Sequence, residues 1–114
     1  MDSRLIYETS KHLKSKIHWK HVIESEWIYC GSNGEVKFDI VLKHIKDHFI
    51  DSKLYVVLTR NDSFETNKEI IIKTVEQLVG SIDFLIWDFR FERVIEFNKV
   101  GVFREGKSVA SIRV

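Results

Sequence analysis

The stretch from Ile82 to Arg104 constrains the fold more than any other part of the chain. It is dense in aromatic and β-branched residues, which favour pleated, half-buried strands. Residues 82–87 are apolar on both alternating faces, and this predicts a strand inside a sheet with both faces covered. From Glu92 to Asn98 apolar and polar residues alternate, so we expect a neighbouring strand with one solvated face.

Turn chemistry divides the end of the chain into further strands. The run Asn98–Gly101 predicts a turn in which Gly101 takes a positive φ. A strand is expected over 102–104, a second turn at Glu105–Gly106, and a last strand over 108–114. The C-terminal third is therefore predicted to form a β-meander of four strands.

Helical and strand signals alternate in the first half of the chain. An imperfect helical period predicts one or two helices over 3–23, and an apolar repeat every four residues predicts a helix over 39–50. Between them, the Asn33–Gly34 pair predicts a tight turn in a hairpin over 26–38.

The middle of the chain completes the predicted fold class. Residues 54–58 read as a strand with apolar residues on both faces. A helix over 66–79 is favoured by the capping-box spacing of Thr66 and Glu69, although the β-branched run 70–72 favours a strand. The order of elements predicts one α+β domain over 1–114, with a mainly antiparallel sheet and two to three helices packed on one face.

Composition excludes several classes of function. The net charge of +1 gives the chain no overall electrostatic reason to bind nucleic acid, and no apolar run approaches the roughly 20 residues of a membrane span. Cys30 is the only cysteine of the chain, which excludes an internal disulfide and favours a reducing compartment. We expect a soluble cytoplasmic protein that does not associate with membranes.

Signatures of catalysis and metal binding are weak. His44 and His48 share a helical spacing that can bind a metal, but no third ligand completes a site, so ordinary surface or boundary histidines are expected. Cys30 is expected to be a buried, inert thiol. We predict no catalytic residue, no metal and no cofactor. A small enzyme of unknown chemistry is the third alternative.

The end of the first C-terminal strand is the best candidate for a contact with another protein. Charged residues alternate there with phenylalanines, and arginine and aromatic residues are enriched in binding hot spots. The surrounding region 61–96 carries eight acids against four bases, which suits a basic partner. Alternatively, the phenylalanines close the end of the sheet. The predicted partner-binding residues are Asp88, Phe89, Arg90, Phe91, Glu92 and Glu96.

Two further contacts are considered. A basic stretch near the N-terminus, with Trp19 as a stacking group, could bind phosphate backbones in a nucleic-acid-associated module; the residues are Lys11, Lys14, Lys16 and Lys20. A solvated helix face is the simpler interpretation of the same lysines. The final strand over 108–114 could be a sheet edge that supports a homodimer.

A resemblance to known proteins indicates which class of protein could use such a contact surface. The C-terminal residues Trp87–Asp88, 94–98 and 101–106 resemble the end of small bacterial proteins of unknown function, and 27–31 and the helix over 39–49 fit the same likeness. Such proteins are similar to the immunity proteins that accompany polymorphic or contact-dependent toxins. The resemblance implies a non-enzymatic inhibitor that binds a cognate toxin and blocks it by occlusion, and it transfers no catalytic residue.

Overall fold

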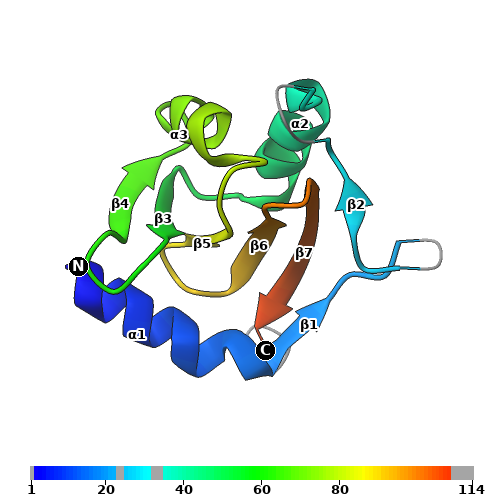
Figure 1. The fold of residues 1–114 in the computed structure, drawn as a ribbon. Coiled ribbons are helices and arrows are strands. Elements are labelled where there is room, and N and C mark those ends of the chain that lie inside the picture. The colour runs from blue at the N-terminus through cyan, green and yellow to red at the C-terminus, as the bar shows by residue number, and fades with distance from the viewer. Residues whose placement is uncertain (1, 23–24, 32–34, 109–114) are drawn as a thin grey trace.

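The computed structural model describes residues 2–22, 25–31 and 35–108 (Figure 1). Its helices are α1 (Ser3–Leu13), α2 (Phe38–His48) and α3 (Ile71–Leu78), with a 3-10 turn at Lys14–Lys16 after α1. Its strands are β1 (Ile17–Trp19), β2 (Ile28–Tyr29), β3 (Lys53–Val57), β4 (Phe64–Asn67), β5 (Phe84–Asp88), β6 (Arg93–Asn98) and β7 (Val102–Ser108).

All described strands belong to one antiparallel sheet. The order is β1-β7-β6-β5-β3-β4, and β2 also pairs with β7. Strands β5, β6 and β7 form a meander of three strands, with Ile86 opposite Ile95 and Ile95 opposite Glu105. Strand β7 replaces the predicted strand over 102–104 and the start of the predicted last strand. The predicted α+β class with a mainly antiparallel sheet is therefore confirmed.

Helices cover both faces of this sheet (Figure 1). Leu54 and Val56 of β3 face the core that α2 and α3 cover, whereas Tyr55 and Val57 face the core that contains Ile6 of α1. Helices α2 and α3 thus share a face, as predicted for two of the helices, whereas α1 covers the opposite face, which the one-face prediction did not include. The reason is visible in the sequence, because interior strands that are apolar on both faces need cover on both.

Helix α1 is attached to the sheet by a buried polar contact as well as by apolar packing. The Asp2 side chain caps its first turn by accepting a hydrogen bond from the backbone N–H of Leu5. One turn before the end of α1, Ser10 Oγ accepts a hydrogen bond from Trp87 Nε1 at 2.9 Å. The helix is shorter than predicted, because Ile17–Trp19 pairs with β7 as a strand.

The predicted hairpin over 26–38 is wrong where the structure describes it. Strand β2 pairs with β7, and Phe38 already begins α2. The Asn33–Gly34 pair lies outside the described residues. Pairing with the long strand β7 replaces the local partner that the turn signal suggested.

The predicted turn at Glu105–Gly106 is also wrong, because β7 runs through both residues. Glycine is needed at 106 for close packing. A Cβ atom there would lie 2.7 Å from the carbonyl oxygen of His18 and 2.8 Å from Cγ2 of Ile17, so a side chain would displace β1. The predicted last strand over 108–114 lies outside the described residues beyond Ser108, and so does its proposed role as a dimer edge.

The region before α3 contains a strand, β4, that was not predicted. Thr66 belongs to β4, and the side chain of Asn67 accepts hydrogen bonds from the backbone N–H groups of Glu69 and Ile70 just before α3. These bonds close the turn at 68–70, and the N-cap residue of α3, Ile70, receives no side-chain capping bond, so the predicted capping box does not form. None of the helices in the described ranges combines the length and the apolarity that crossing a lipid bilayer requires.

Candidate functional site

The turn between β5 and β6 is built around the buried side chain of Asp88. This side chain is 2% exposed, and its Oδ1 atom accepts hydrogen bonds from the backbone N–H groups of Glu92 (2.8 Å) and Arg93 (3.1 Å). Burial raises the pKa of the Asp88 carboxyl, and the two N–H donors oppose part of this rise. The Asp88 carboxyl therefore fixes the path of the chain into β6.

Phe91 holds the same turn from within the fold. Its φ of 55° lies in the left-handed region, which a bulky residue rarely adopts and which costs on the order of 1–3 kcal/mol. The ring is 8% exposed, stacks on Tyr55 with centroids 5.0 Å apart, and lies 5.5 Å from the ring of Trp87. Burial of the ring offsets the backbone strain.

The outer residues of the turn are displayed to solvent. Phe89 is 41% exposed, and the Arg90 guanidinium carbon lies 5.5 Å from the centroid of its ring. Arg90 Nη2 also donates to Asp51 Oδ1 at 3.1 Å, in the segment that follows α2. An exposed aromatic ring and an arginine thus sit on a turn whose base is fixed by Asp88 and Phe91.

Five of the six predicted partner-binding residues lie together on this turn, and Glu96 does not. Glu96 lies further along β6, where its oxygens contact Arg104 Nε (2.7 Å) and Lys14 Nζ (3.4 Å). Within the turn, Asp88 and Phe91 are buried, so the predicted contact surface is reduced to Phe89, Arg90 and the partly exposed Glu92.

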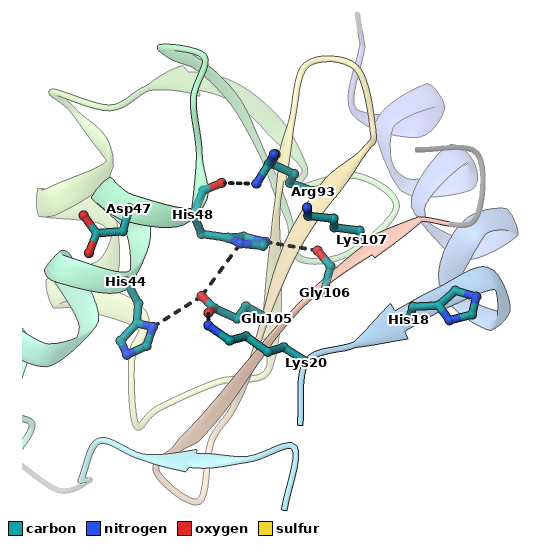
Figure 2. Close-up of a pocket in the computed structure, with 9 residues that line it drawn as sticks. All are labelled: His18, Lys20, His44, Asp47, His48, Arg93, Glu105, Gly106 and Lys107. Atoms are coloured by element: carbon teal, nitrogen blue, oxygen red, sulfur yellow. Dashed lines mark hydrogen bonds and ion pairs between the residues drawn. The ribbon is translucent and has the colours of Figure 1, made fainter. Parts of the chain in front are cut away.

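A hollow of about 550 Å³ lies beside Arg93, the first residue after this turn. We call it the histidine hollow, because three of the residues that line it are histidines (Figure 2). It forms where the C-terminal half of α2 stands beside β1, β6 and β7. The lining residues are His18, Lys20, His44, Asp47, His48, Arg93, Glu105, Gly106 and Lys107.

Glu105 forms the floor of the histidine hollow and is buried. One carboxylate oxygen contacts Lys20 Nζ at 3.4 Å, and the other contacts His44 Nδ1 at 3.3 Å and His48 Nδ1 at 3.8 Å. His48 Nε2 donates to the carbonyl oxygen of Gly106 at 3.0 Å. Burial lowers the pKa of His48, and the Glu105 carboxylate opposes part of this shift.

This arrangement joins the acid and the bases of the hollow to one another. Both oxygens of Glu105 have cationic or imidazole partners, and the Nε2 atom of His48 is bonded to backbone. Within the described ranges, no group of three or more histidine, cysteine or acidic side chains is arranged so that it could hold a metal ion. The histidine hollow is therefore a fixed, polar concave surface.

Sequence reasoning identified the spacing of His44 and His48 but missed the hollow itself. The missing residue was Glu105, which was assigned to a turn. Reading 102–108 as one strand would have placed Glu105 and Lys107 on the same face as Phe103, because side chains alternate along a strand.

The four lysines of the nucleic-acid hypothesis do not share one face. Lys14 contacts Glu96 beside α1, whereas Lys20 contacts Glu105 on the opposite side of the sheet. The Nζ atom of Lys16 lies 3.2 Å from Nε2 of His12, and Lys11 is exposed on α1. The stretch 11–21 crosses from helix to strand, so its cations diverge.

The comparisons with known proteins give no relative. No protein-family model, no curated protein and no solved structure matches this chain.

Proposed function

We propose that this chain is a non-enzymatic protein-binding module that contacts its partner through Phe89 and Arg90. The observation that carries the proposal is the rigid display of this pair above the buried Asp88 and Phe91. Aromatic and arginine side chains provide much of the binding energy at protein interfaces. A turn that is already ordered also avoids the loss of conformational entropy that a flexible loop suffers on binding.

Two ionisable groups of the histidine hollow, Glu105 and His48, are held by the protein itself, which favours a binding role for them. General acid–base catalysis needs a base with a free lone pair near the substrate. Here Glu105 and His48 are bonded to groups of the protein itself. A surface of this kind offers fixed charges and shape, which are the requirements of recognition.

We further propose that the partner is a toxin domain and that the chain blocks it by occlusion. The resemblance of the C-terminal strands to immunity proteins supports this class, and the displayed Phe89 and Arg90 supply a physical contact. We also propose a cytoplasmic location. It is supported by Cys30, a buried free thiol whose pKa is raised by burial, since free cysteines are typical of reducing compartments.

The test measures whether the protein binds the toxin encoded by the neighbouring gene and whether it protects cells against that toxin. In the double variant Phe89→Ala/Arg90→Ala we expect affinity to fall by a hundredfold or more, because each hot-spot truncation removes about 2 kcal/mol. The matched control is Lys99→Ala/Val100→Ala, which truncates two exposed residues of the next turn.

The two double variants distinguish a specific contact from a general loss of binding. The proposal stands if the control protects cells and binds like the wild type while the Phe89/Arg90 variant, folded by circular dichroism, does neither. It fails if both double variants bind equally well, or if the wild-type protein binds no neighbouring toxin.

A further inference from the structure

Three ionisable residues form a row across three adjacent strands at the histidine hollow. Arg93 of β6 is directly opposite Lys107 of β7, and Lys107 is directly opposite His18 of β1. All three line the hollow, so they project from the same face of the sheet. Figure 2 shows the side chains of Arg93 and Lys107 next to each other. We call these three residues the cationic row.

No residue of the cationic row forms an ion pair within 4.0 Å among the described residues. Like charges directly opposite each other on a sheet are destabilising. Arg93 and Lys107, which are directly opposite each other, are therefore an unfavourable pair in the isolated protein, and an anion placed above them would relieve the repulsion.

The acids of the hollow do not neutralise the row. Glu105 lies two residues before Lys107 on the same face of β7, and it is engaged by Lys20 and by the histidines of α2. The Asp47 carboxylate points away from Arg93 and Lys107 in Figure 2. Arg93 donates one hydrogen bond, from Nη1 to the carbonyl oxygen of His48 at 3.3 Å, which leaves most of its five N–H donors available.

We propose that the cationic row is a binding site for the terminal phosphate of a small phosphomonoester. A terminal phosphate carries close to two negative charges at neutral pH and three acceptor oxygens, so it can accept hydrogen bonds from Arg93 and Lys107 at the same time. A carboxylate offers one charge and two oxygens. The volume of about 550 Å³ is within the range of small-ligand pockets. This site goes beyond the proposed function and does not rest on it.

The experiment uses inorganic phosphate and glycerol phosphate as probes of the full chain. Amide chemical shifts are followed by NMR at pH 7 while sodium chloride keeps the ionic strength constant. We expect saturable shifts at Arg93, Gly106 and Lys107 with both probes. Arg93→Gln and Lys107→Gln should each weaken binding about tenfold or more, because a hydrogen bond to a charged group contributes about 1.5–3 kcal/mol.

The matched control is Lys11→Gln, which removes one exposed lysine from α1 on the other side of the sheet. It should bind phosphate like the wild type. If Lys11→Gln weakens binding as much as Lys107→Gln, the effect is general screening and the proposal fails. It also fails if the wild-type shifts with phosphate do not differ from those with chloride.

A second arm tests the phosphodiester as the ligand. A short RNA with a 5′-phosphate is compared with the same RNA without it. Tighter binding of the phosphorylated RNA supports a terminal-phosphate site, whereas equal binding of both overturns it in favour of the nucleic-acid backbone. Neither result bears on the Phe89–Arg90 contact, which the toxin-binding test addresses separately.

Discussion

The two hairpin turns on either side of β6 have the same backbone arrangement but are built from different residues. Each turn places a positive-φ residue three positions after a polar one, as Asp88 and Phe91 (φ 55°) or as Asn98 and Gly101 (φ 99°). In each, the later residue donates its N–H to the carbonyl oxygen of the earlier one, at 3.0 Å. The polar side chain also accepts hydrogen bonds from backbone N–H groups, two at Asp88 and one at Asn98.

The difference lies in what stabilises the positive φ. Glycine has no Cβ and adopts this conformation without strain, so the β6–β7 turn needs nothing from the core. Phe91 is strained and persists because its ring packs on Tyr55 and Trp87. The β5–β6 turn is therefore coupled to the interior of the protein, and this coupling is what makes it a rigid platform for Phe89 and Arg90.

The largest test of this difference replaces Phe91. Phe91→Ala should reduce the free energy of unfolding by about 3 kcal/mol or more, because it removes a buried ring and keeps the strained φ. Phe91→Gly should be no more destabilising than Phe91→Ala, since glycine relieves the strain. Urea denaturation of both variants measures this. A glycine variant that is clearly less stable than the alanine variant would contradict the strain at this position.

The next test concerns the buried carboxyl of Asp88. Asp88→Ala should reduce the free energy of unfolding by about 1–3 kcal/mol, because the N–H groups of Glu92 and Arg93 lose their acceptor. Asp88→Asn keeps an oxygen acceptor and removes a buried charge, so it should be at least as stable as the wild type at pH 7. Thermal unfolding of the two variants side by side would show whether the acceptor or the charge matters.

A smaller effect is expected at the glycine turn. Gly101→Ala should reduce stability by about 1 kcal/mol, because alanine is strained at a φ of 99°. Binding to a partner through Phe89 and Arg90 should not change. Loss of partner binding in this variant at unchanged fold would show that the two turns are not independent.

The smallest predicted effect is a pH dependence. Because burial raises the pKa of Asp88 in the folded protein, the folded state holds this proton to a higher pH than the unfolded state. The stabilisation from Asp88 is therefore complete below the ordinary aspartate pKa and is lost as the pH rises through the raised pKa. Relative to Asp88→Asn, the wild type should lose stability as the pH rises above the ordinary aspartate pKa of about 3.9, as measured by urea denaturation at several pH values. A constant difference would rule out the raised pKa.

The sequence predicted the elements that are long enough to show an apolar period of their own. Strands β3, β5 and β6 and helix α2 have clear apolar periods, and all four lie where those periods placed them. Strands β1, β2 and β4 have two to four residues each, and their pairing is supplied by β7 or β3. A strand of two to four residues is too short to show a local sequence pattern that would predict it.

The candidate sites divide in the same way. The turn after β5 is contiguous in sequence, so its residues could be predicted as a group, although the burial of Asp88 and Phe91 could not. The histidine hollow combines residues from 18 to 107, and its register depends on β7 continuing through Gly106. A glycine chosen for close packing with β1 was indistinguishable in sequence from a glycine chosen for a turn.

The position of β7 has a consequence for the order in which the chain folds. Among the described residues, β1 and β2 pair with no strand except β7. A ribosome therefore releases Ile17–Trp19 long before Val102–Ser108, the segment that these residues pair with, has been made. The sheet edge nearest the start of the chain is completed last, and premature termination before Val102 leaves both early strands unpaired.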